Sequence, residues 1–310
     1  MPSINILIIN LNINIMKYIR SIFFLLGISC LFLFQSCSTC SRQQTLENIV
    51  FDIDLSDLAG DSDYFTMGSM VLYVLPTPIE ASMLVKNWGI PYPELLNDPA
   101  NASKYLTKQK MAVNFGVYAT DIICAGLYEQ AQTILQYKQA VQQLVEGLGL
   151  QSAVDRQMIE KMEANINNKK ELMQIISEIY ASCSEFLSAD ERDFYALAVL
   201  SGGWVEGMYI ATNMVDENNV TDIELMRSIV TDNKQTFDLL WIALSQLDEI
   251  PDDAVYLMLD MSYVAHLFGH KTLLSVPQKT ETYNPDNITP QFFADLKNHI
   301  RILRQQFTKI

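Results

Sequence analysis

Positive charge is scarce in this 310-residue sequence, in which 21 Lys and Arg face 36 Asp and Glu. The resulting formal charge of −15 makes a strongly acidic surface, which repels phosphate backbones. Nucleic acid is therefore not an expected partner. The same charge disfavours adsorption to an anionic lipid surface unless a covalent anchor holds the protein there.

Familiar catalytic motifs are missing as well. There is no G-x-S-x-G nucleophile elbow, and Gly147-Leu148-Gly149 lacks the third glycine and the preceding strand of a dinucleotide site. These absences favour a protein that is not an enzyme.

Long apolar runs are also missing. Met111–Leu127 and Phe194–Ala211 each contain a carboxylate and fall short of the roughly 20 apolar residues that span a bilayer. We expect both stretches to form buried helices of a bundle.

The stretch Met16–Cys37 follows the order of a secretory signal peptide, in which charged residues come first, an apolar run follows and small residues come last. Lys17 and Arg20 precede the apolar run Ile22–Phe34, whose length of about thirteen residues is short of the roughly 20 needed for a membrane-spanning helix. We therefore expect residues 1–36 to be a cleaved signal peptide. Residues 1–15 carry no charge, so Met16 is the expected start, and a long signal peptide beginning at Met1 is the alternative.

Cys37, directly after the small Ser36, resembles the lipobox of bacterial lipoproteins. In that family the peptide is cleaved before the cysteine, which becomes the acylated N-terminus. The resemblance implies fatty acyl (palmitate) attachment at Cys37, a tether over 37–50 and a membrane partner in the cell envelope. Surface-directed lipoproteins of the Bacteroidota carry an acidic run after this cysteine. Here the first acid is Glu47, which favours the outer membrane with the body facing the periplasm.

Processing would change both the charge and the cysteine content. Loss of Lys17 and Arg20 leaves 19 basic against 36 acidic residues, a formal charge of −17. Of the five cysteines, Cys30 would leave with the signal peptide. Cys124 and Cys183 lie among apolar neighbours, so we expect both side chains to be buried as small apolar groups and not to form a redox pair.

Residues 51–310 are expected to form a single helical domain, an all-α bundle of about nine or ten helices. Capping boxes begin at Thr77, Ser188 and Thr221, and Thr289-Pro290 opens the last helix. Only Ile49–Leu55 alternates like a strand. The expected helices cover 78–88, Asn101 to Gly147 with a break near Gly126, a polar helix from Ser152, 168–187, Ser188 to Val215, Thr221 to Leu247, 252–268 and a last one from Pro290.

Two strings in the body carry a second resemblance. NFGVYATDIICAGLYEQ at 114–130 and GGWVEGMYIAT at 202–212 resemble uncharacterised all-helical lipoproteins of the Bacteroidota. This resemblance implies a fold and a location but no activity.

Acidic residues lie inside the most apolar predicted helices. A buried, unpaired carboxylate is costly, so each must reach the surface, find a donor or serve a site. One hypothesis is a polar pocket between central helices, for which nearby glycines leave room. The other is that each acid is hydrogen-bonded internally and only fixes the packing, which the pattern favours. The acids are Asp121, Glu206, Asp238 and Asp260, and the candidate pocket residues are Asp121, Tyr118, Glu206, Trp204, Tyr209 and Asp260.

His266 and His270 are one helical turn apart and would share a face. With Asp260 or another acid they could ligate a metal. The intervening residues do not supply the Glu of an HExxH motif, and two histidines also suit the negative end of a helix dipole. We expect no cofactor, with a metal at this pair as the alternative.

The sequence thus supports two hypotheses of different classes. The first is a lipid-anchored, non-enzymatic envelope protein that binds or scaffolds an envelope protein or a small ligand. The second is a ligand- or metal-dependent protein, a class that includes enzymes, and it would use the buried acids and the histidine pair. The second requires Asp121, Glu206 and Asp260 to meet in one cavity.

Overall fold

Helices make up most of the part of the chain that the computed structural model describes, namely residue 92 and residues 95–154, 156–189, 192–215, 223–247, 252–272 and 281–310. No strand occurs in these residues, which confirms the all-α class. The signal peptide, Cys37, the tether, the Ile49–Leu55 strand and the 78–88 helix lie outside the described residues.

All described residues belong to one compact unit, Tyr64–Ile310. Within them there are one short 3-10 helix and eight α-helices. In chain order these are η1 (Pro99–Lys104), α5 (Lys108–Leu127), α6 (Ala131–Leu148), α7 (Arg156–Ala164), α8 (Lys169–Ala189), α9 (Asp193–Asn213), α10 (Ile223–Ser245), α11 (Asp252–Leu267) and α12 (Pro290–Thr308).

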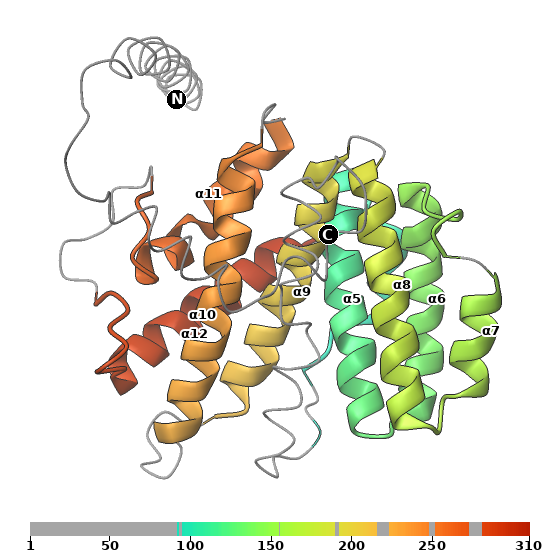
Figure 1. Ribbon diagram of the computed structural model, residues 1–310, viewed down its shortest axis with the longest axis horizontal. Helices are drawn as coiled ribbons and strands as arrows, with labels where there is room; N and C mark the ends of the chain where they lie inside the picture. Colours follow the sequence, from blue (N-terminus) through green and yellow to red (C-terminus); the bar gives the residue numbers. More distant parts are fainter. Residues whose placement is uncertain are drawn as a thin grey trace, which may run out of the picture. The chain divides into compact units, whose positions relative to one another are not determined.

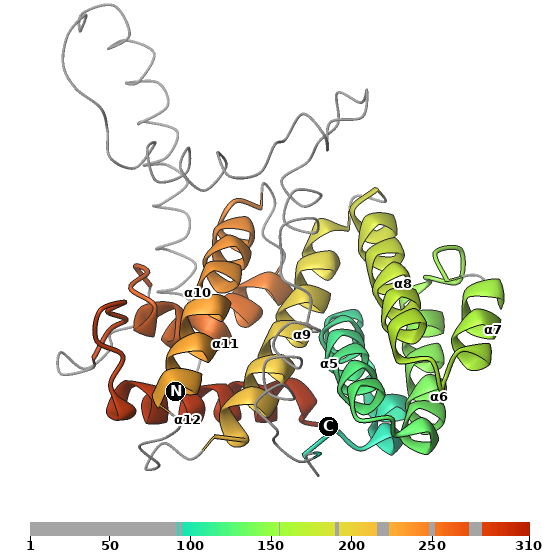
Figure 2. The ribbon, with the colours of Figure 1, turned by 60° about the horizontal axis from the view of Figure 1, so that its bottom comes forward.

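Helices α5 and α9 form the centre of the bundle. Figures 1 and 2 show α6, α8 and the short α7 on the α5 side, and α10, α11 and α12 on the α9 side. Both central helices are buried around nearly their whole circumference. Within the described residues only α9 is long and apolar enough to cross a membrane, yet 89% of its apolar window is buried inside the bundle. The expected burial of Met111–Leu127 and Phe194–Ala211 is confirmed.

Glycines bring the backbones of α5 and α9 into direct contact. A Cβ atom added at Gly116 would lie 1.9 Å from the carbonyl oxygen of Val199, and one added at Gly202 would lie 1.9 Å from that of Val113. Only hydrogen fits at these two positions. Thr120 Oγ1 on α5 also donates to the Gly203 carbonyl oxygen on α9, at 3.2 Å. The glycines therefore serve close packing and leave no room for a ligand between these two turns.

Several local predictions were right and others were wrong. The break near Gly126 is confirmed, because α5 ends at Leu127 and α6 begins at Ala131. The helix expected from Asn101 instead begins at Lys108, where the Thr107 side chain accepts a hydrogen bond from the Lys110 amide. The proline-led turn η1 occupies the residues before it.

The capping box at Ser188 was assigned to the wrong place. Ser188 belongs to α8, which continues to Ala189, and α9 begins only at Asp193. The preceding residue, Arg192, forms no side-chain cap. By contrast, Thr289 caps α12 as predicted, since its Oγ1 accepts from the Phe292 amide at 3.0 Å. The Thr221 box lies outside the described residues.

Candidate functional site

Glu206 on α9 and Arg304 on α12 form an ion pair inside the bundle. Arg304 Nε donates to Oε2 of Glu206 at 2.9 Å and Nη2 donates to Oε1 at 3.1 Å, a two-bond geometry that matches a guanidinium to a carboxylate. The Glu206 side chain is 0% exposed and that of Arg304 is 14% exposed. Burial alone would lower the pKa of Arg304, but the Glu206 charge raises it above its ordinary value. Arg304 therefore stays charged.

Asp121 on α5 is fully buried beside this pair. Its Oδ2 accepts a hydrogen bond from the backbone amide of Asn97 at 3.1 Å, while Oδ1 has no partner that donates to it. Burial, followed by the charge of Glu206, raises the pKa of Asp121 well above its ordinary value, although Arg304 and the Asn97 amide oppose the shift. A protonated Asp121 can donate to Glu206, which leaves one negative charge to balance Arg304.

These four residues, Asn97, Asp121, Glu206 and Arg304, are called the buried polar cluster below. The cluster holds the segment 95–98, because Arg304 Nη2 also donates to the Leu95 carbonyl oxygen at 3.3 Å. One amide and one carbonyl of this irregular segment are thus bonded to side chains of α5 and α12. Backbone groups that are shielded from water outside regular secondary structure require such partners.

Three tyrosines complete the attachment of this segment. Tyr118 Oη donates to the Asp98 carbonyl oxygen at 2.8 Å, and Tyr137 Oη donates to that of Asn97. The Asn97 side-chain amide donates to Tyr105 Oη at 3.1 Å. Burial raises the pKa of all three tyrosines above the ordinary value, so their hydroxyl groups remain neutral.

The structure brings some predicted pocket residues together and separates others. Asp121 and Glu206 meet, Tyr118 lies next to the segment they hold, and the Arg304 guanidinium carbon lies 4.6 Å from the ring centroid of Tyr209. Trp204 points elsewhere: its Nε1 donates to the Asn233 carbonyl oxygen at 3.2 Å and its ring packs against Phe237.

Asp260 is outside the buried polar cluster. It lines a cavity between α11 and α12, together with Tyr263 and His299. The single pocket predicted for Asp121, Glu206 and Asp260 is therefore not formed by these three side chains.

The two predicted metal ligands do not share a helical face. Helix α11 ends at Leu267, and Gly269 adopts a left-handed φ of 87°, which turns the chain before His270. His270 Nε2 lies 2.7 Å from Asp238 Oδ1, whereas the His266 ring neighbours Tyr263. Among the residues that the structure describes, no group of three or more His, Cys, Asp and Glu side chains is arranged around a common metal position.

Arg304 and Asn97 are the members of the cluster that sequence reasoning missed. Arg304 lies in the last turns of α12, where a cation also complements the helix dipole. Its spacing from Ile300 and Phe307, four and three residues away, placed it on the buried stripe of that helix. A buried position for an arginine requires an acid partner, and this was the available signal. Nothing in the sequence marks Asn97.

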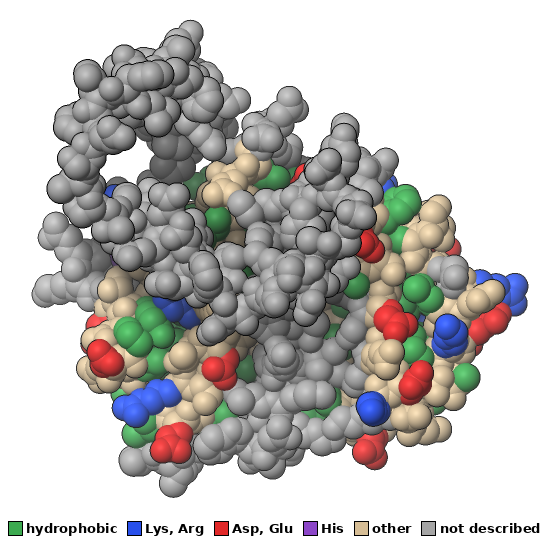
Figure 3. Space-filling model, viewed as in Figure 1, with side chains coloured by type: hydrophobic (Ala, Val, Ile, Leu, Met, Phe, Trp, Pro, Cys, Tyr) green, Lys and Arg blue, Asp and Glu red, His purple; other side chains and the backbone are tan. Residues whose placement is uncertain are grey.

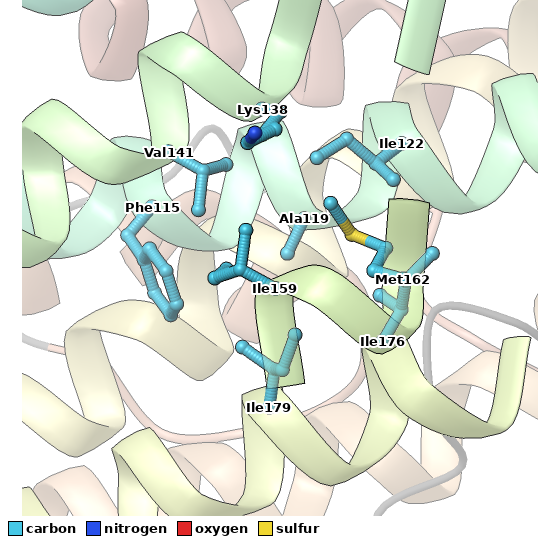
Figure 4. Close-up of a pocket in the computed structure, with 9 residues that line it drawn as sticks. All are labelled: Phe115, Ala119, Ile122, Lys138, Val141, Ile159, Met162, Ile176 and Ile179. Carbon is cyan, nitrogen blue, oxygen red and sulfur yellow. The ribbon is translucent and has the colours of Figure 1, made fainter. Parts of the chain in front are cut away.

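Apolar side chains line a small cavity between α5, α6, α7 and α8. Figure 4 shows Phe115, Ala119 and Ile159 facing this space, with the Lys138 nitrogen at its edge. The volume of about 30 Å³ is far below the range of roughly 300–1,000 Å³ typical of ligand pockets. Lys138 is also paired with Glu163 on α7. This cavity is a packing defect rather than a ligand site.

Comparison with known proteins gave no relative: no protein-family model matches the chain, and no curated protein or solved structure matches it.

The raised pKa of Asp121 predicts a specific pH dependence of stability. Between the ordinary pKa of about 3.9 and the raised folded value, the folded chain binds a proton that the unfolded chain has lost. The contribution of this group to stability is therefore complete below the ordinary pKa and is lost as the pH rises through the folded pKa. Asp121→Asn keeps an acceptor for Asn97 and a donor for Glu206 at every pH.

We expect the free energy of unfolding of wild type, relative to Asp121→Asn, to fall as the pH rises through this window. Urea unfolding of both proteins at a series of pH values measures the difference, and the other titrating groups cancel. Parallel curves for the two proteins would show that Asp121 has an ordinary pKa in the folded state.

Proposed function

We propose that the protein is a lipid-anchored, non-enzymatic protein of the cell envelope, a helical bundle that binds or scaffolds a partner on the periplasmic side of the outer membrane. The observation that carries this proposal is the order of the Met16–Cys37 stretch, with its charged start, apolar run and final cysteine. The membrane would be its first partner, through the acyl chains. A single acyl chain gives only marginal attachment, so more than one is needed.

The use of the buried acids supports a non-enzymatic role. Asp121 Oδ2 accepts from the Asn97 amide, the two Glu206 oxygens accept from Arg304, and both acids are fully buried. A general acid or base must instead reach a substrate proton within hydrogen-bond distance. The alternative of one ligand or metal site built on Asp121, Glu206 and Asp260 loses support because Asp260 lies outside the buried polar cluster.

The surface supports a partner other than nucleic acid. On the face shown in Figure 3, the coloured Lys and Arg side chains occur singly or in small groups among Asp and Glu. Nucleic-acid binding relies on a concentrated basic surface that neutralises several phosphates. The formal charge of −15 opposes such binding further.

The anchor is tested by Cys37→Ala in the native host, with Cys40→Ala as the matched control three residues further along. We expect wild type and Cys40→Ala in the membrane fraction at the mature size. Cys37→Ala is expected either in the soluble fraction or as a longer, unprocessed precursor. Mature-sized Cys37→Ala that stays in the membrane fraction would contradict lipid anchoring.

A further inference from the structure

A cavity of about 220 Å³ lies between α11 and α12, outside the buried polar cluster. Helix α11 contributes Asp260 and Tyr263, and α12 contributes His299, Ile302, Leu303 and Gln306. The volume falls below the roughly 300–1,000 Å³ of pockets for drug-sized ligands, so any occupant is small. The cavity combines one carboxylate with apolar walls, and Ile302 at its edge is 38% exposed.

Asp260 differs from Asp121, Glu206 and Asp238, whose carboxylates each accept a hydrogen bond from a described residue. Within the described residues its carboxylate makes no hydrogen bond or ion pair, although it is partly buried. Lys110 is close enough for its charge to lower the pKa of Asp260 against the larger, opposite effect of burial. The Lys110 ammonium, however, donates to the carbonyl oxygens of Gln306 and Phe307 at the end of α12.

His299 supplies a fixed hydrogen-bond acceptor in the same cavity. Its Nδ1 lies 2.7 Å from the carbonyl oxygen of Asp295, which can only accept, so Nδ1 carries the proton. In the neutral ring Nε2 is then an acceptor. The imidazole is stacked on Tyr263 with ring centroids 3.5 Å apart and planes inclined by 3°, which holds its orientation.

We propose that this cavity binds a small primary ammonium compound with an apolar substituent. An ammonium group has three donors and no acceptor, and it matches the Asp260 carboxylate, His299 Nε2 and the Gln306 side-chain oxygen. Hydrogen bonds from a cation to a carboxylate are among the stronger ones in proteins. The apolar substituent lies against Ile302 and Leu303. A metal ion fits less well, because Asp260 and His299 are only two of the usual four protein ligands.

The three histidines of the chain make the site visible by NMR. The full-length protein is labelled with ¹³C-histidine and titrated with butylamine, or with butan-1-ol as the neutral analogue of equal length. We expect butylamine to shift the His299 signal in a saturable manner while the His270 signal stays in place. Butan-1-ol is expected to cause no saturable shift. Equal shifts with both compounds would overturn the proposal, because the carboxylate would then play no part.

Two variants test the role of Asp260. Asp260→Asn is expected to weaken butylamine binding at least tenfold, whereas Asp286→Asn, which removes the same charge from an exposed position before α12, leaves the affinity within twofold. Gln306→Leu provides a second probe and is expected to weaken binding while the unfolding midpoint stays unchanged. Equal affinity in Asp260→Asn and Asp286→Asn, no saturable shift in wild type, or a His299 shift with Zn²⁺ but not with butylamine would each overturn the proposal.

Discussion

Glu206→Gln is expected to lower the free energy of unfolding by about 3 kcal/mol, because Arg304 loses its hydrogen-bonded carboxylate and keeps only the nearby Asp121 as a countercharge. The ion pair is well shielded from water, because the side chains of Glu206 and Arg304 are only 0% and 14% exposed. Arg304 would retain only the Leu95 carbonyl as a strong acceptor. Urea unfolding followed by far-UV circular dichroism measures the loss.

A surface pair of the same chemistry is the matched control. Arg156 and Glu160 on α7 form an ion pair whose side chains are 91% and 58% exposed. Glu160→Gln is therefore expected to cost no more than about 1 kcal/mol. The double variant Glu206→Leu/Arg304→Met, which removes both charges, should recover a large part of the loss. Equal costs for Glu206→Gln and Glu160→Gln would contradict a buried, paired Glu206.

Gly116→Ala is the second change with a large expected effect, a loss of about 3 kcal/mol in the free energy of unfolding. The added methyl group would meet backbone atoms, namely the Val199 carbonyl oxygen at 1.9 Å and the Gly203 amide nitrogen at 2.6 Å. Backbone of a packed helix cannot rotate away as a side chain can. Helices α5 and α9 must therefore separate, and the contacts along both are lost together.

Gly147→Ala is the control for this substitution. Its Cβ would lie 2.6 Å from the sulfur of Met111, a flexible side chain that can change rotamer. Alanine also favours a helix over glycine by about 1 kcal/mol, so we expect a net change within about 1 kcal/mol of zero. Chemical unfolding compares the two variants. A cost for Gly116→Ala no larger than for Gly147→Ala would show that α5 and α9 are not in backbone contact.

The sequence was a good guide where structure depends on neighbours along the chain. The Thr289 cap, the break near Gly126 and the buried face of α12 follow from residues within one or two turns. The errors have a local cause as well. The signal at Ser188 has the right residues for a cap, but α8 continues through it to Ala189. Leu135 follows Ala131 by four residues, a spacing typical of one helix face, yet it is 41% exposed.

The candidate site was only half predictable. Burial of Asp121 and Glu206 was foreseen, and so was the choice between a pocket and an internal hydrogen-bond network. Their partners were not foreseen, because Glu206 and Arg304 are 98 residues apart in the chain and the donor to Asp121 is a backbone amide. Backbone groups look alike in every sequence. Pairing across helices depends on how α5, α9 and α12 pack, and spacing within one helix does not specify that.

The structural role of the buried polar cluster is tested most directly by hydrogen exchange at the Asn97 amide, which donates to Asp121. If the cluster holds the segment 95–98, this amide is protected in wild type. In Asp121→Leu, which removes the acceptor at similar volume, Asn97 should lose its protection while amides of α8 such as that of Ile176 keep theirs. Rapid exchange of Asn97 in wild type, or unchanged protection in Asp121→Leu, would contradict that role.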